Sequence, residues 1–208
     1  MAPDGKVTGI DIDPGMVEVA RGLAATSRLA GDWQVASALA MPFADDRFDL
    51  CLCLQGLQFF PDRGAGFAEC RRVLRPDGRL FASLWRPIED NEGHLALARA
   101  LEHQNVDPAP VRRPFSFADA GEIRETAREA GFRTVEVRTG ERLAKFHSIE
   151  GFIDGLAAGA PSARHALVQI PEESRGDFVE EVKGSLEAFV TENGLELPMR
   201  SHIVIATP

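Results

Sequence analysis

Tyrosine is absent from this chain of 208 residues, and cysteine is scarce, with three residues. No mechanism of the chain can therefore use a tyrosine hydroxyl. The odd, sparse cysteine set argues against a disulfide framework and favours a reducing compartment, so we expect a cytoplasmic protein. No apolar run approaches the ~20 residues of a membrane-spanning helix. Residues 1–13 lack the basic and apolar regions of a secretory signal, so none is expected.

Positive charge is also in short supply. The 23 lysine and arginine residues against 32 aspartate and glutamate residues give a net charge of −9. With no basic block, the chain is a poor candidate for binding a nucleic-acid backbone or an anionic membrane surface, and we expect neither as a partner. The 44% of hydrophobic and 26% of charged residues are typical of a folded globular domain with a sizeable core.

Strand and helix patterns alternate over the first part of the chain. Short apolar runs predict strands at 6–11, 33–36, 48–54 and 80–85, and 3.6-residue periodicity predicts helices at 16–29 and 64–73. The run 48–54 is almost wholly apolar, which is typical of a strand buried on both faces of a parallel sheet. The alternation predicts an α/β fold with helices on both faces of the sheet.

The pattern changes after Arg86. Helices are expected at 88–106, 119–131, 148–158 and 172–193, strands at 134–138 and 202–206, and a loop at 107–114. We expect one domain, 1–208, which divides as follows: a core at 6–86, helical cap segments at 87–131 and 148–198, and final strands at 132–146 and 200–207.

Three loops carry candidate binding residues. Asp11 ends a predicted strand, where an acid can accept hydrogen bonds from the two hydroxyls of a ribose; a turn or helix-cap aspartate is an equally common reading. Ser37 and Ala38 begin a loop that could face a purine edge, although an ordinary strand–helix connection is favoured from these residues alone. Gln55 follows the buried strand, and Gln58 with the two phenylalanines after it forms either a pocket wall or a packed helix start.

A metal site is not expected. Cys51 and Cys53 share a strand face without two further ligands, and Asp11-x-Asp13 lacks the rest of a calcium loop. The five histidines (His94, His103, His147, His165 and His202) never stand at the helical metal spacing. Two of them, His94 and His103, lie where substrate lids often sit, and either could act as a general base; a solvated surface histidine is the more common identity.

Three linked segments resemble the class I S-adenosylmethionine-dependent methyltransferases, more narrowly the small-molecule group related to ubiquinone and menaquinone biosynthesis. They are Val7-Thr8-Gly9-Ile10-Asp11-Ile12-Asp13-Pro14-Gly15-Met16, Ala38-Leu39-Ala40-Met41-Pro42-Phe43-Ala44-Asp45-Asp46-Arg47-Phe48-Asp49 and Glu69-Cys70-Arg71-Arg72-Val73-Leu74-Arg75-Pro76-Asp77-Gly78-Arg79-Leu80. The resemblance implies a Rossmann-like, mostly parallel sheet with a helical cap insertion and S-adenosyl-L-methionine as cofactor.

Carried over residue by residue, the resemblance assigns a cofactor site. Asp11 matches the acid on the ribose, Ile12 and Met16 match apolar neighbours of the adenine, and the backbone of Ala38 matches the adenine edge. Gln55 matches the loop near the methionine end of the cofactor. Ser37 stands where the family usually has an aspartate. No catalytic residue is identified, because the family transfers the methyl group by direct displacement and depends chiefly on positioning.

The family's first strand and its glycine-rich loop are expected before Lys6, outside these 208 residues. That strand is central in the family's sheet, and a missing central strand leaves backbone groups unpaired. Three outcomes are open: the flanking strands 6–11 and 48–54 pair directly, a second copy fills the gap by strand exchange or edge pairing, or the native product is longer.

Two functions are therefore expected as alternatives. One is methyl transfer to a small, hydrophobic acceptor, with Phe59, Trp85 and Phe115 as candidate walls of its pocket. The other is a degenerate methyltransferase-like protein that acts by binding a partner without catalysis.

Overall fold

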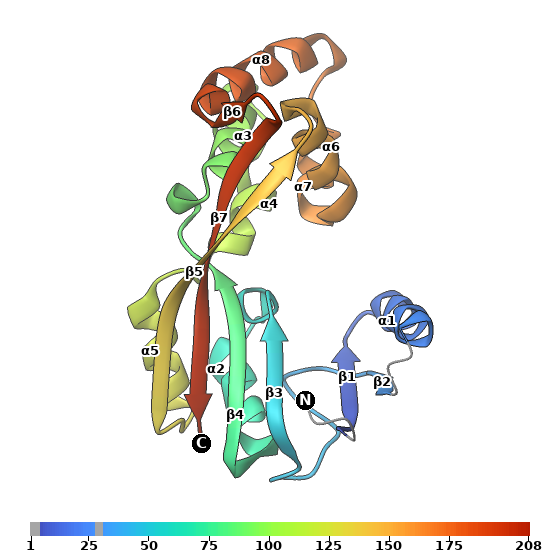
Figure 1. The fold of residues 1–208 in the computed structure, drawn as a ribbon, viewed down its shortest axis with the longest axis vertical. Coiled ribbons are helices and arrows are strands. Elements are labelled where there is room, and N and C mark those ends of the chain that lie inside the picture. Colours follow the sequence, from blue (N-terminus) through green and yellow to red (C-terminus); the bar gives the residue numbers. More distant parts are fainter. Residues whose placement is uncertain (1–4, 28–30) are drawn as a thin grey trace.

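A computed structural model describes residues 5–27 and 31–208, and it confirms the predicted α/β fold (Figure 1). The first part of the chain contains β1 (Val7–Asp11), α1 (Pro14–Thr26), β2 (Gly31–Val35), β3 (Phe48–Leu54), α2 (Arg63–Val73) and β4 (Leu74–Trp85). The strands predicted at 6–11, 33–36 and 48–54 are confirmed, and so is the helix at 64–73. The end predicted for the first helix, 27–29, lies partly outside the described residues.

The strands form two separate sheets. β1 pairs with β2 in parallel, and the second sheet has the order β3-β4-β7-β5. β3 and β4 are parallel, whereas β7 (Gly194–Thr207) runs antiparallel to β4 and to β5 (Thr134–Phe146). All strands of this four-strand path except β7 therefore run in one direction, as in a mostly parallel sheet. The short β6 (Val190–Thr191) forms a hairpin with β7.

An open gap separates the two sheets. β1 and β3 point the same way in Figure 1, yet within the described residues neither strand pairs across the space between them. Direct pairing of the two flanking strands, one of the three expected outcomes, is therefore wrong. Because β1 uses one edge for β2 and β3 uses one edge for β4, each presents its other edge with free backbone groups.

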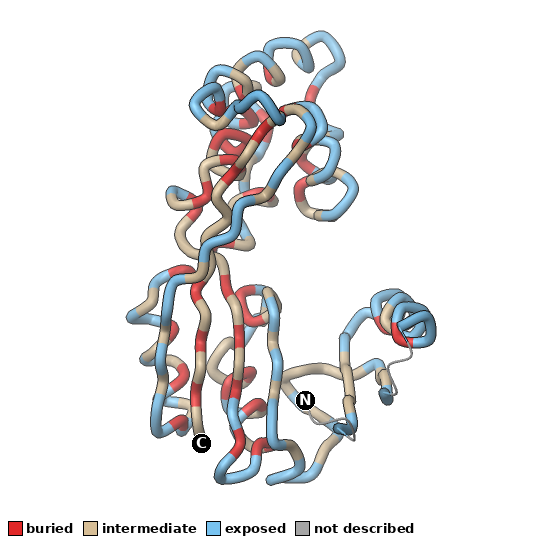
Figure 2. Tube along the Cα trace, viewed as in Figure 1, coloured by how far each residue is buried: buried red, intermediate tan, exposed pale blue. Residues whose placement is uncertain are grey.

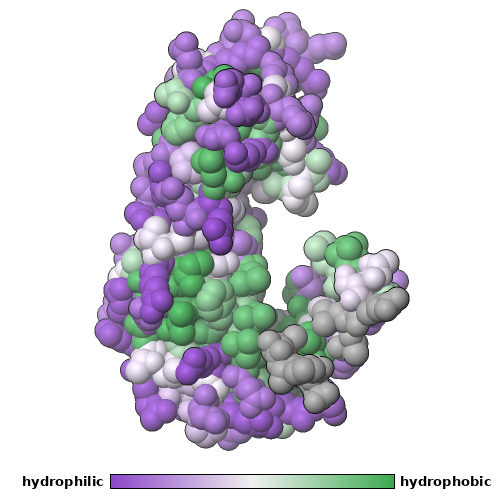
Figure 3. All heavy atoms as spheres, viewed as in Figure 1, coloured by the Kyte–Doolittle hydropathy of each residue, from purple (hydrophilic) through white to green (hydrophobic). Residues whose placement is uncertain are grey.

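One face of the larger sheet is covered and the other is open. Helices α2 and α5 (Ala120–Glu129) pack on the covered face, where Phe67, Leu80, Ile123 and other residues form an apolar cluster. Leu50, Leu52 and Leu54 lie on the opposite face and are exposed (Figures 2 and 3). The prediction that 48–54 is buried on both faces is thus wrong, because no described element covers this side of β3.

A second apolar cluster lies above the sheet, in a helical lobe. Its helices are α3 (Glu92–His103), α4 (Ala109–Arg112), α6 (Ile149–Gly159), α7 (Pro161–Leu167) and α8 (Arg175–Leu186). β5 and β7 are long enough to leave the sheet as a two-stranded ribbon and enter this lobe (Figure 1). Leu195 and Leu197 of β7 belong to the upper cluster, whereas Val204 and Ala206 belong to the lower one.

Several element boundaries differ from the prediction. β4 begins at Leu74, earlier than the predicted start at residue 80, and its pairing with β3 is irregular between Phe48 and Leu50. The loop predicted at 107–114 contains α4 and the start of a 3-10 turn, Arg113–Phe115. β5 lies within the predicted final-strand segment 132–146, whereas β7 begins at Gly194, before the predicted start at 200, because its outer part pairs with β5 rather than with β4. Every helix within residues 5–27 and 31–208 is too short or too polar to cross a bilayer.

Candidate functional site

Asp11 lies at the carboxyl end of β1, in the turn that leads into α1. Its Oδ1 accepts the backbone N–H of Asp13 at 2.9 Å, and Asp13 in turn caps the helix by accepting from the N–H of Gly15 at 2.7 Å. The capping role therefore belongs to Asp13. Asp11 remains exposed at the strand end, where its carboxylate can accept hydrogen bonds from a ligand.

The glycine before this turn has a packing role. A Cβ atom built at Gly9 would lie 2.3 Å from the ring of Trp33, which stands on the paired strand β2. Any side chain at Gly9 would therefore displace the indole ring. Gly9 and Trp33 are register partners, so the absence of a side chain at Gly9 lets the indole ring pack over β1.

The loop after β2 begins beside Asp11. The N–H of Ala36 donates to the carbonyl of Asp11 at 3.0 Å, which places Ser37 and Ala38 at the same carboxyl edge. Ser37 Oγ accepts the N–H of Leu39 at 3.1 Å, so the hydroxyl shapes the loop. Ile12 and Met16 add apolar surface next to the carboxylate, with 73% and 53% of their area exposed. Five of the six predicted cofactor residues thus lie around one strand pair.

The loop after Ser37 is held in place by one arginine. Arg72 of α2 donates to the carbonyls of Met41 and Phe43 at 3.0 and 2.7 Å, and it also pairs with Glu69 and Asp45. The N–H of Met41 donates to Glu69 at 2.7 Å. The Arg72 guanidinium keeps the pKa of Glu69 below its usual value, so this carboxylate stays charged. The network fixes the path from the candidate site into β3.

Gln55, the sixth predicted residue, lies across the gap at the carboxyl end of β3. Its φ of 57° is in the left-handed region, which costs a non-glycine residue energy and turns the chain sharply. Its Nε2 donates to Ser201 Oγ at 3.2 Å, and its Oε1 accepts from Gln58 Nε2 at 2.9 Å. The structure therefore does not bring Gln55 into one strand pair with Asp11. Both lie at the carboxyl ends of strands that point the same way (Figure 1).

The segment after Gln55 is partly packed and partly exposed. Gln58 is buried, and its Oε1 has no hydrogen-bond partner among the described residues. Phe60 packs against the lower cluster, whereas Phe59 is exposed. Sequence reasoning missed Ser201, since only the antiparallel pairing of β7 beside β4 brings this serine next to Gln55.

The cysteines and His202 have structural surroundings, whereas His103, His147 and His165 are exposed. Burial raises the pKa of the Cys53 thiol to about 11, while a hydrogen bond with Cys70 lowers the pKa of Cys51. His202 is buried, and its Nε2 contacts the carbonyl of Ala118 at 2.8 Å. In the part of the chain that the structure describes, no three His, Cys, Asp or Glu side chains are grouped to hold a metal ion.

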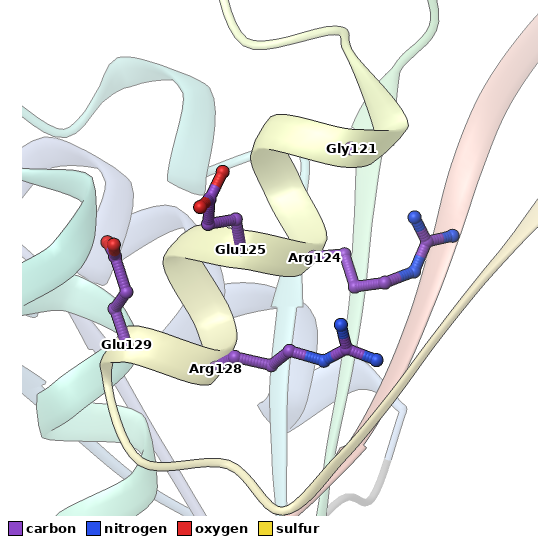
Figure 4. A pocket seen from close by; sticks show the side chains of 5 residues that line it. All are labelled: Gly121, Arg124, Glu125, Arg128 and Glu129. Atoms are coloured by element: carbon purple, nitrogen blue, oxygen red, sulfur yellow. The ribbon is translucent and has the colours of Figure 1, made fainter.

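Two surface hollows lie away from the candidate site. One of about 530 Å³ runs along the outside of α5, where Arg124 and Arg128 extend to one side and Glu125 and Glu129 to the other (Figure 4). The mixed charges are typical of a solvated helix face. The other hollow, of about 300 Å³, lies between Arg71, Arg133 and Pro208, at the opposite end of the sheet from Gln55.

Comparison with known proteins shows which family the first part of the chain resembles. Residues 1–82 match the model of the methyltransferase domain family Methyltransf_11. The O-methyltransferase resE of Aspergillus sclerotiorum is 32% identical over 133 residues, which are 63% of this chain and 47% of that protein. The ubiquinone/menaquinone biosynthesis C-methyltransferase UbiE of Geotalea daltonii is 42% identical over 76 residues, which are 36% and 32% of the two chains. The chain spans less than half the length of these curated relatives.

Solved structures agree on the fold. The YcgJ protein from Bacillus subtilis aligns with a TM-score of 0.60 at 16% identity, covering 96% of this chain and 81% of that one. Phosphoethanolamine N-methyltransferase 2 of Haemonchus contortus, in complex with S-adenosyl-L-methionine, aligns with a TM-score of 0.54 at 16% identity over 97% and 43% of the chains. The protein thus has a Rossmann-like fold. Its fold and the matched segment 1–82 are similar to those of class I S-adenosylmethionine-dependent methyltransferases.

Proposed function

We propose that the protein transfers a methyl group from S-adenosyl-L-methionine to a small, hydrophobic acceptor. The observation that carries the proposal is the carboxyl edge of β1 and β2, where an exposed carboxylate, a serine loop and two exposed apolar side chains lie together. These residue types fit an adenosine: Asp11 would bind the ribose hydroxyls, while Ile12 and Met16 would flank the adenine. The loop at Ser37 and Ala38 would face the adenine edge.

The chemistry needs little from the protein beyond positioning. The bound cofactor supplies a methyl group on a positively charged sulfur, which is open to direct displacement. The chain's part is to hold the acceptor in line and to exclude water from it. Trp85 packs against the apolar cluster of the lobe above it, and this supports an uncharged small molecule as the acceptor.

Isothermal titration calorimetry with S-adenosyl-L-methionine tests the cofactor site. We expect dissociation constants in the micromolar range for the native chain and no detectable binding for Asp11→Ala. Asp32→Ala is the matched control, since Asp32 is an exposed carboxylate at the amino end of β2 and should leave binding unchanged. If the cofactor binds neither to the folded chain nor to a version that includes residues encoded ahead of Met1, the alternative is favoured, in which a degenerate methyltransferase-like protein acts through a partner.

We further propose that a parallel strand closes the gap between β1 and β3 in the active protein. Two sources remain from the sequence-based alternatives: a second copy, by strand exchange or edge pairing, or residues encoded ahead of Met1. Sedimentation equilibrium separates them, because the chain alone has a mass of 22.6 kDa and a pair has twice that mass. A monomer that binds the cofactor only when upstream residues are included would exclude the paired form.

The three cysteines of the chain are all free, which supports the expected cytoplasmic location.

A further inference from the structure

Trp85 lies on the same edge and face of the sheet as Gln55. It ends β4 and pairs with Ser201 of β7, and residues directly opposite in an antiparallel pair point to the same face. Gln55 donates to that same Ser201 at 3.2 Å. Trp85 is therefore next to the part of the candidate site that lies across the gap from Asp11.

Helix α3 places His94 against this tryptophan. The ring centroids of His94 and Trp85 are 5.8 Å apart, and those of His94 with Phe115 and Phe152 are 5.1 and 6.4 Å apart. Phe115 and Phe152 are buried, whereas Trp85 and His94 are only half-buried. The part of this aromatic cluster that a ligand can touch thus consists of an indole and an imidazole.

The imidazole is neutral and has a defined outward atom. Burial among the rings lowers the pKa of His94 to about 4, so the ring is uncharged at pH 7. Its Nδ1 is enclosed and has no hydrogen-bond partner within the described residues. An enclosed N–H without an acceptor is rarer in proteins than an enclosed lone pair, so Nδ1 carries the lone pair. The proton is then assigned to Nε2, the ring nitrogen of this half-buried side chain that is not among the enclosed, unpartnered atoms.

The nearby charged groups are already paired with one another. Arg200 binds Glu92 at 2.8 Å and lies on the opposite face from its neighbour Ser201, because side chains alternate along a strand. Arg86 binds Asp90 at 2.8 Å. A ligand that reaches His94 and Trp85 therefore meets one neutral donor and apolar rings.

We propose that His94 and Trp85 form the acceptor-binding surface and select a planar, apolar molecule that carries an oxygen. The Nε2–H of His94 donates to that oxygen, and Trp85 covers the apolar body. An ammonium group is disfavoured, because it has only hydrogen-bond donors and cannot accept from the Nε2–H of His94. It would also lose its hydration shell without gaining an unpaired carboxylate as a partner. The description of this molecule as the methyl acceptor rests on the proposed function.

Three matched probes test this surface: p-cresol, p-xylene, in which a methyl group replaces the hydroxyl, and 4-methylbenzylamine. Affinities are measured by NMR titration of the indole N–H of Trp85, assigned with Trp85→Phe. We expect p-cresol to bind roughly fivefold more tightly than p-xylene, the effect of one hydrogen bond. In His94→Phe, which keeps a ring of similar shape, the two should bind equally.

The control variant is His103→Gln, which changes an exposed histidine on the same helix and should keep the preference for p-cresol. Nitrogen-15 spectra of the native protein should show the proton of His94 on Nε2. The proposal is overturned if p-cresol and p-xylene bind the native protein equally, or if a folded His94→Phe still prefers p-cresol. It is also overturned if 4-methylbenzylamine binds most tightly, or if the spectra place the His94 proton on Nδ1. The calorimetric titration measures cofactor binding and does not depend on these probes. A failure of the proposed function is therefore distinguished from a failure of the His94 and Trp85 surface.

Discussion

His94 makes the stability of the protein depend on pH in a way that one substitution can remove. In the folded chain, burial holds its pKa at about 4, whereas an unfolded chain has the ordinary value of 6.5. Between these values the unfolded state binds a proton that the folded state excludes. Stability therefore falls as the pH is lowered from 7, and the loss stops growing below pH 4.

The size of the effect follows from the shift. Each pKa unit is about 1.4 kcal/mol, so the cost is ~2 kcal/mol at pH 5 and ~3 kcal/mol at pH 4. Glu69 also has a lowered pKa and adds a loss of the same sign at low pH, so a comparison of two proteins is needed. The free energy of unfolding in urea, measured at pH 7 and pH 5, should drop less in His94→Phe than in the native chain, by ~2 kcal/mol. Equal drops in both proteins would refute the argument.

Three further outcomes are expected. Asn91 is fully buried, and its side chain hydrogen-bonds both the N–H and the carbonyl of Arg200. Asn91→Leu should therefore lower the free energy of unfolding by ~2–3 kcal/mol, and unchanged urea curves would contradict this. Arg72→Ala should speed hydrogen exchange in residues 41–46 roughly tenfold, and protection equal to the native level would argue against the anchoring role. Leu52→Thr should cost less than about 0.5 kcal/mol, whereas a larger loss would mean that this exposed face is covered in solution.

Local patterns predicted the elements that depend on local forces. The β-branched run before Asp11 and the apolar run 48–54 gave strand positions close to the observed ones, and Gly131, with a φ of 95°, ends a helix as expected. The carboxyl-edge positions of Asp11 and Ser37 were also predictable, since they follow from parallel pairing.

Features that arise from distant pairing were not predictable. The outer half of β5 has little apolar alternation and that of β7 has it only at Leu195 and Leu197; both are strands because they pair with each other. The contact of Gln55 with Ser201 joins residues that only the sheet order brings together. Burial of 48–54 was overestimated, because the same apolar run fits a strand with two covered faces and a strand with one.

The placement of β7 sets the order in which the protein can mature during synthesis. All other elements of both apolar clusters precede it in the sequence, yet β7 lies between β4 and β5 and contributes side chains to each cluster. A ribosome-bound chain that lacks Gly194–Thr207 therefore carries two unfinished cores and an unpaired β4 edge. Until those residues emerge, the nascent chain exposes strand edges and depends on chaperones to avoid aggregation.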